Sequence, residues 1–459
     1  MPNVDLRGYA ELFKAYTELR VQDNRSISVT LVKGNVTANS RSSISGASAR
    51  VHKSGSWGFS SIPDTTADSI KSVVRTATEN AVFLDSRERK SRGALPIVTA
   101  SSENDFSTKK SRLGQKDLVD FVRALDDHVA QKYPGLSSRT VSLSCLDMEK
   151  TLLTSDGSRS HSMVPRSFIQ IGLCVEKDGR PVDLWKSYGG LGQFEDVFTS
   201  PGDLHSGIEE QHQHLLSKAE GVFADAGVKT CVLDAEMSGF LAHEAIGHTT
   251  EADLVMGGSV ASRYLGREAG SPLVTLVDFA NAALGKTCPV PVYVDDEGTL
   301  AQDACIINQG VLRTYLHNKE SAAHFGVAPT GNARAYLFSD EPLIRMRNTA
   351  IMPGTSKIAD MIASVDDGYY LVRSSNGQAD STSEFMFGVS LGYEIKGGKM
   401  GRAIRDTTIS GVAFDLLKSV TMVSDEMSWS RSGMCGKKQM IPVGMGGPAL
   451  KCRVSIGGR

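Results

Sequence analysis

Turn-forming residues interrupt the second half of this chain every few positions. Glycine, proline, asparagine and aspartate separate short β-like runs at 296–298, 308–310, 353–354, 367–368 and 396–398. Many short strands with turn signals between them are typical of an antiparallel sheet that curls into a barrel. We therefore expect residues 226–459 to form a largely antiparallel, barrel-like β domain, in which the glycines at 444–447 form a turn.

The first half of the chain has a different texture, in which helical spacings alternate with strand pairs. Apolar residues recur at helical spacing over 5–19, from about 66, over 116–130 and over 203–222. Strand patterns occur over 27–36 with a turn at 33–35, over 140–153, and around a turn at 177–179, while 85–93 is a charged connector. We predict an α+β fold with an α/β domain of helices and β-hairpins over 1–225 and a β-rich catalytic domain over 226–459.

Length, charge and cysteine content limit the class of protein. A chain of 459 residues is too long for one ordinary core. The formal net charge is −2 at pH 7 and no basic block occurs, which argues against nucleic acid as a partner. No apolar run approaches the roughly 18 residues that cross a bilayer, so no membrane contact is expected. Seven widely spaced cysteines favour a reducing compartment, and we expect a cytoplasmic protein.

The segment from Ser238 to His248, which reads SGFLAHEAIGH, indicates chemistry most directly. Neutral imidazoles bind zinc, and a glutamate beside the metal can accept a proton from the attacking water. His243 and His248 are therefore candidate zinc ligands, and Glu244 is the candidate general base. Ser238 is expected to cap the helix that carries them.

The two histidines are five residues apart, whereas the familiar zinc-peptidase helix spaces them by four. At about 100° per residue, five steps turn the second histidine roughly 140° from the first, so a regular helix would not aim both at one ion. An inserted residue that forms a π-bulge, or a helix that loosens at Gly247, would bring them together. The alternative interpretation is an ordinary buried helix with two incidental histidines.

A catalytic zinc site needs a third protein ligand and one position for water. Glu251 lies three residues after His248 on the same stretch, and Cys435 is flanked by glycines that allow a close main-chain approach. A thiolate is a strong zinc ligand, although a small buried hydrophobe is the commoner role of a cysteine. Residue chemistry alone leaves both candidates open.

Several separate blocks of the second half resemble the TldD/PmbA family of peptidases, also described as modulators of DNA gyrase. The blocks are 243–248 with 251–253, 295–298, 307–312, 330–334, 342–349 and 434–437 leading to 442–443. Because the histidine motif is kept, the chain resembles the catalytic TldD type and not the partner, PmbA (also called TldE), which lacks it. Where the family usually has a glycine between lysine and glutamine after the cysteine, this chain has Lys438.

This resemblance implies one zinc ion per chain, held by His243, His248 and Cys435. It also implies Glu244 as general base, and it favours Cys435 over Glu251 as the third ligand. The expected activity is hydrolysis of peptide bonds in unfolded proteins or peptides, in protein turnover or peptide maturation.

Further expectations concern residues that contact substrate, the partners of the chain and two alternative functions. Candidate contacts to substrate or to the developing oxyanion are His317, Arg334 and Arg345. The resemblance implies a peptide or unfolded protein as substrate, and a homodimer or a heterodimer with a PmbA/TldE-like homologue. Two other classes stay open: a hydrolase that uses Cys435 as nucleophile with a histidine as its base, and a non-catalytic subunit of a peptidase complex.

Overall fold

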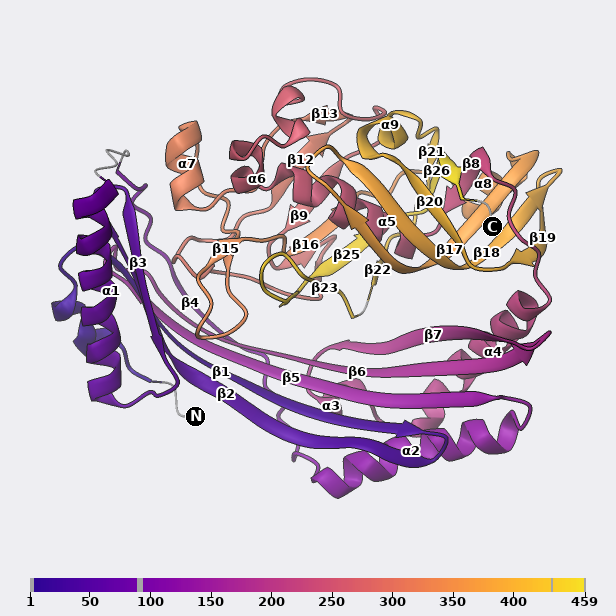
Figure 1. The fold of residues 1–459 in the computed structure, drawn as a ribbon, viewed down its shortest axis with the longest axis horizontal. Helices are drawn as coiled ribbons and strands as arrows, with labels where there is room; N and C mark the ends of the chain where they lie inside the picture. The colour runs from indigo at the N-terminus through magenta and orange to yellow at the C-terminus, as the bar shows by residue number, and fades with distance from the viewer. Residues whose placement is uncertain (1–3, 89–93, 431, 458–459) are drawn as a thin grey trace.

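The computed structural model describes residues 4–88, 94–430 and 432–457. A long, curved sheet formed by the first part of the chain lies beneath a second part built from residues 227–457 (Figure 1). Helices and strands are mixed throughout, which confirms the predicted α+β class. Within the described residues, no helix has the length and apolar character needed to cross a membrane. The division into domains near residue 225 stays a prediction.

Two long antiparallel hairpins form the centre of the curved seven-stranded sheet. The strand order is β3-β2-β1-β5-β6-β4, and β7 also pairs with β6. The strands are β1 (Tyr16–Val32), β2 (Asn35–Lys53), β3 (Ser56–Ile62), β4 (Ser101–Asp105), β5 (Ser138–Thr154), β6 (Arg159–Lys177) and β7 (Arg180–Leu191). Positive φ at Lys33-Gly34 and at Asp178-Gly179 forms the turns that were predicted there.

Helices pack on this sheet through the apolar faces that their spacing predicts. They are α1 (Ala67–Glu88), α2 (Gln115–Lys132), α3 (Phe194–Val197), α4 (His205–Ala219) and the 3-10 helices η1 (Arg7–Leu12) and η2 (Pro201–Leu204). Helix α2 covers the face that points away from residues 227–457 (Figure 1). The connector predicted over 85–93 is wrong up to residue 88, where α1 continues, and its remainder lies outside the described residues.

The helix predicted over 5–19 is wrong. Only Arg7–Leu12 is helical, as a short 3-10 segment, and β1 begins at Tyr16. The apolar residues up to Phe13 pack beside α1 at irregular spacing. Leu19 and its apolar neighbours instead alternate along β1 with polar residues that the second part of the chain buries. The helical spacing of apolar residues over 5–19 thus arose by chance across a loop and a strand.

Residues 227–457 contain a closed ring of five strands, which confirms the predicted barrel-like architecture. The ring runs β17-β8-β26-β20-β18 and closes because β18 also pairs with β17. Strands β19 and β21 extend it. The strands are β8 (Gly227–Leu233), β17 (Asp367–Ala379), β18 (Glu384–Lys396), β19 (Lys399–Ile404), β20 (Thr407–Val412), β21 (Met422–Val423) and β26 (Leu450–Ile456).

A second sheet of this part supports the motif helix. Its order is β13-β12-β9-β16-β25-β22. These strands are β9 (Leu276–Phe279), β12 (Ala304–Asn308), β13 (Val311–Leu312), β16 (Asn348–Ile351), β22 (Ser428–Ser430) and β25 (Gly444–Gly447). Short pairs are β10 (Ala282–Ala283) with β11 (Lys286–Thr287), β14 (Ala333–Arg334) with β15 (Leu343–Ile344), and β23 (Met434–Cys435) with β24 (Ile441–Pro442).

The remaining helices of this part are short. They are α5 (Ala235–Leu241), α6 (Ala252–Met256), α7 (Lys319–Phe325), α8 (Ile358–Ala363), α9 (Ala413–Lys418) and the 3-10 helix η5 (Val260–Arg263). Helix α5 begins one turn earlier than predicted, with Asp234 before it. Ser238 therefore lies inside the helix and is not its cap, and its hydroxyl donates to the main-chain oxygen of Pro448.

Glycines let helix α5 approach strand β25 closely. A Cβ added to Gly239 would lie 2.7 Å from the main-chain nitrogen of Gly446, and one added to Gly447 would lie 2.4 Å from the Ser238 hydroxyl. The turn predicted at Gly444–Gly447 is wrong, because this segment is a strand whose missing side chains make room for the helix.

Buried ion pairs join the two parts of the chain. Arg50 of β2 pairs with Glu297, and Lys150 of β5 and Arg20 of β1 lie 2.7 Å and 3.7 Å from Asp296. Charges at such depth are costly unless they are paired. These contacts therefore fix how the sheet and the second part lie against each other.

Replacing Gly239 with alanine is expected to lower the free energy of unfolding by about 1–3 kcal/mol, because the new methyl group overpacks the contact with β25. Denaturant-induced unfolding measures the change. Gly8→Ala is the matched control, since its added Cβ meets nothing within 4 Å. Equal unfolding free energies for the two variants would contradict the described contact.

Candidate metal centre

The motif helix changes its winding at the histidines. Helix α5 ends at Leu241, residues Ala242–Gly247 form a π-helical turn (η3), and His248–Thr250 form a 3-10 turn (η4). The N–H of His248 donates to the main-chain oxygen of His243, a step of five residues. The two imidazole centroids consequently lie 5.1 Å apart. Of the two alternatives that the histidine spacing left open, the structure shows the π-bulge.

Close packing explains the glycine at the end of the π-helical turn. A Cβ at Gly247 would lie 1.9 Å from the Met346 sulfur. Met346 is itself fully buried just before strand β16. A side chain at residue 247 would therefore push the turn away from the sheet that supports it.

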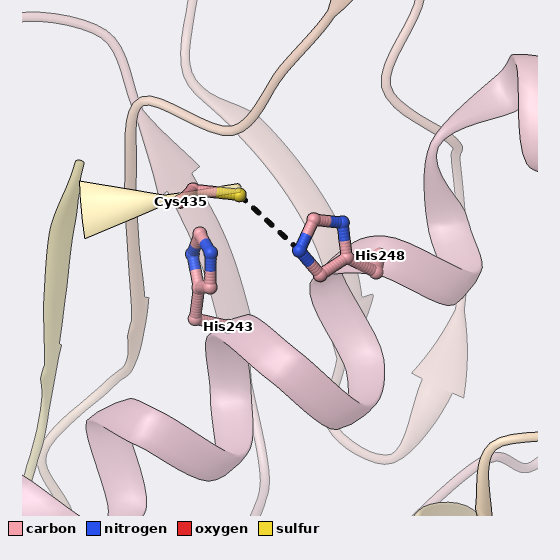
Figure 2. Close-up of side chains that lie close together, drawn as sticks. All are labelled: His243, His248 and Cys435. Carbon is pink, nitrogen blue, oxygen red and sulfur yellow. Dashed lines mark hydrogen bonds between the residues drawn. The ribbon is translucent and has the colours of Figure 1, made fainter. Parts of the chain in front are cut away.

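Cys435 meets the histidines from a distant part of the chain. It lies in β23, and its Sγ is 3.3 Å from Nε2 of His248 (Figure 2). One ligand atom from each of His243, His248 and Cys435 lies within 4.8 Å of the others. The structure thus brings together all three predicted ligands.

The donor set fits a zinc ion. His243 is fully buried, and neither of its ring nitrogens has a hydrogen-bond partner among the described residues. A buried polar atom left this way costs free energy unless something binds it. Around one zinc ion, thiolate and imidazole ligand atoms are separated by roughly 3.3–3.6 Å, so the observed spread is compatible with side chains that converge on a single ion.

Electrostatics at the cluster favour a bound cation. Burial raises the pKa of the Cys435 thiol, but the neighbouring His243 and His248 outweigh this effect and lower it to about 3. Burial lowers the pKa of His248, but the negative charges of Glu251 and Cys435 raise it well above its usual range. Cys435 is therefore held as thiolate, the form that binds zinc, and the thiolate and the Glu251 carboxylate lie at the two ring nitrogens of His248.

Glu244 lies at the open side of the cluster. Its Oε2 is 3.8 Å from Nε2 of His248, and the side chains of Glu244 and His248 are 19% and 18% exposed. Cys435, by contrast, is 2% exposed and His243 is fully buried. The solvent-exposed side of the cluster is therefore the side on which Glu244 and His248 lie.

Glu251 contacts the candidate ligand His248 and is not part of the candidate ligand cluster. Its Oε2 accepts a hydrogen bond from Nδ1 of His248 at 2.8 Å, on the opposite ring nitrogen from the one that faces Cys435. Carboxylates in this position orient metal-binding histidines. The geometry favours this role over the alternative of Glu251 as the third ligand.

Arg345 holds the segment that carries the cysteine. It is fully buried, and its guanidinium donates to the main-chain oxygens of Cys435 (2.9 Å), Lys437 (3.1 Å) and Gln439 (2.8 Å). Charge-assisted hydrogen bonds to three carbonyls of one loop fix its path. These contacts favour a structural role for Arg345 over direct contact with substrate.

Arg334 and His317 likewise form hydrogen bonds within the protein. Arg334 donates to the main-chain oxygens of Met346 (2.5 Å) and Pro442 (2.8 Å). His317 bonds the Ser321 hydroxyl through Nδ1 at 3.1 Å, and burial lowers its pKa to about 4, so its ring is neutral at pH 7. The contacts of both residues favour structural roles.

Lys437 was missed by sequence reasoning, although it stands two residues after Cys435. Its ammonium lies between Glu251 and Asp253. No local pattern points to this contact, because Lys437 and Asp253 are 184 residues apart in the sequence. The next residue, Lys438, has a φ of +56°, a conformation that favours glycine. This explains physically why glycine suits the position.

The three side chains form a candidate metal site, and comparison with known proteins assigns the family. Residues 226–458 match the family described as PmbA/TldA metallopeptidase C-terminal domain, and residues 17–81 match its domain 1. A metalloprotease TldD homolog of Haemophilus influenzae is 32% identical over 79% of this chain and 76% of its own length. The chain belongs to the PmbA/TldD metallopeptidase family and is a peptide hydrolase.

Two further relatives extend the comparison. The zinc metalloprotease TldD homolog of Saccharolobus solfataricus is 26% identical over 90% of each chain. The crystal structure of TldE from Thermococcus kodakarensis superposes with a TM-score of 0.76 at 16% identity and covers 99% of each chain. This second likeness shows that the fold is shared.

Replacing Lys438 with glycine is expected to raise the free energy of unfolding by up to about 1 kcal/mol. Relief of left-handed strain, about 1–2 kcal/mol, exceeds the entropy that glycine adds to the unfolded chain, about 0.4–1 kcal/mol. The same change at Lys399, an exposed residue of strand β19, should lower stability. A destabilised Lys438→Gly variant in denaturant unfolding would contradict the left-handed conformation.

Proposed function

We propose that this chain is a zinc-dependent peptidase that hydrolyses peptide bonds in unfolded proteins or peptides. The observation that carries the proposal is the convergence of His243, His248 and Cys435, with His243 buried and unpaired among the described residues. These residues would hold one zinc ion per chain. Zinc, when bound, would supply a Lewis acid that activates water and polarises the scissile carbonyl.

Glu244 is proposed as the general base. Its carboxylate lies at the open side of the cluster, where it can accept the proton of the attacking water. The same carboxylic acid can then return the proton to the leaving amine. Glu251 holds Nδ1 of His248, so the Nε2 lone pair stays directed at the ligand cluster.

A cysteine hydrolase is the second candidate, and one observation favours it. Cys435, His248 and Glu251 form a line of hydrogen bonds, 3.3 Å and 2.8 Å long, that resembles a nucleophile–base–acid arrangement. The burial of Cys435 and the unpaired imidazole of His243 favour the metal site instead. A thiol enzyme would keep its activity in the presence of a metal chelator.

The proposal includes a homologous subunit as partner. The fold shared with TldE of Thermococcus kodakarensis supports a dimer, formed either by two copies of this chain or with a PmbA/TldE-like homologue. A role in protein turnover or peptide maturation would follow from the substrate class.

Metal content of the purified protein tests the ligand set. Mass spectrometry should find about one zinc per wild-type chain and much less in Cys435→Ala, because three protein ligands are needed. The control is Cys305→Ala, which removes a half-buried thiol of strand β12. Equal zinc in Cys435→Ala and wild type would exclude Cys435 as a ligand. A metal-free wild type that cleaves peptides would favour the cysteine hydrolase.

Glu244→Gln tests the general base. Turnover of dye-labelled unfolded casein should fall by about 10²–10⁴-fold, because the amide cannot accept the proton. Zinc content and the unfolding transition should stay at wild-type values, which separates loss of chemistry from loss of the site. Wild-type turnover in this variant would contradict the mechanism.

A further inference from the structure

Lys437 connects the cysteine segment to the histidine helix. Its Nζ lies 2.9 Å and 2.7 Å from the two carboxylate oxygens of Asp253 and 3.2 Å from Oε2 of Glu251. It also donates to the main-chain oxygen of Ile344 at 3.1 Å. Its side chain is 11% exposed, while that of Glu251 is fully buried. Two segments that meet only in the folded protein are thus joined by one ammonium group.

Glu251 is shared between Lys437 and His248. The same Oε2 atom accepts from Nδ1 of His248 at 2.8 Å. A carboxylate at Nδ1 keeps a ring proton there and orients the ring so that Nε2 is the nitrogen directed at Cys435. A fully buried carboxylate is stable in its charged form only when cations or donors surround it. Lys437 is the lysine whose ammonium group contacts this carboxylate.

The position of Lys437 in the chain gives it a second effect. It follows Cys435 by two residues, and Arg345 binds the main-chain oxygens of both residues. Arg345 therefore holds the main chain of this loop, and the side chain of Lys437 ties the same loop to Glu251. Cys435 and His248 are 187 residues apart in the sequence, so contacts between their segments are needed to bring the two side chains together.

We propose that Lys437 is a positioning residue of the metal centre, which sets both the orientation of His248 and the approach of Cys435. It acts through Glu251 and through the loop, without contacting substrate. This inference rests on the proposed zinc site and assigns a function to a residue outside the ligand set. Removal of an outer partner of this kind typically weakens metal affinity about 10–100-fold.

The test compares Lys437→Met with Lys438→Met in the full-length protein. The two variants lose the same charge one residue apart, and Lys438 is exposed. The zinc dissociation constant is measured by competition with a chromophoric chelator, and the ligand geometry by the absorption spectrum of the cobalt(II)-substituted protein. Lys437→Met should raise the dissociation constant about 10–100-fold and alter the sulfur-to-cobalt band, whereas Lys438→Met should match wild type.

Lys437→Arg separates a positioning role from general support of the fold. Its guanidinium can reach both acids, so it should restore much of the zinc affinity and the cobalt spectrum. Wild-type affinity and spectrum in Lys437→Met would overturn the proposal. So would an affinity loss that arginine does not restore and that accompanies unfolding of the metal-free protein. A wild type that binds no zinc would instead overturn the proposed function itself.

Discussion

In the turn Ala242–Gly247 the main-chain hydrogen bond from His248 spans five residues, and the geometry of the site depends on this step. It turns two imidazoles that a regular helix would separate by roughly 140° toward one point. Such a turn is less stable than a regular helix and persists only where packing requires it. That packing comes from glycines, because Gly239 lies against strand β25 and Gly247 against Met346, with no room for a Cβ at either contact.

The position of Cys435, the proposed third ligand, depends on buried cations. Arg345 gathers carbonyls of the loop that carries Cys435, and Lys437 ties that loop to the acids after His248. Charged groups placed in this way are costly without partners, so they specify one arrangement of the chain. The same principle operates on a larger scale where Arg50 meets Glu297 between the sheet and the second part. Buried charged groups thus hold together the distant segments that contribute the candidate ligands.

Local patterns predicted much of this structure. The closely spaced turns predicted the barrel-like part, and the turn residues at 33–35 and 177–179 predicted two hairpins. The five-residue histidine spacing predicted a distorted helix, for which a π-bulge was one of two alternatives. The predictions that were wrong concern segments whose structure depends on contacts with distant parts of the chain. The helix over 5–19 was wrong because strand β1 buries polar residues under a part of the chain that sequence alone cannot place. The turn at Gly444–Gly447 was wrong because its glycines serve a helix-on-strand contact. Lys437 and the contacts of Arg345 were out of reach for the same reason, and the ligand roles stay predictions.

X-ray absorption at the zinc edge of the zinc-loaded protein tests the proposed ligand set most directly, since it reports which atoms surround the ion. The proposed zinc site should show one sulfur at about 2.3 Å and two imidazole nitrogens at about 2.0–2.1 Å, with one further light atom. Any zinc that Cys435→Ala still binds should have no sulfur neighbour and should keep imidazole neighbours. A wild-type spectrum without sulfur, or with a single imidazole, would contradict the convergence of His243, His248 and Cys435 on one metal.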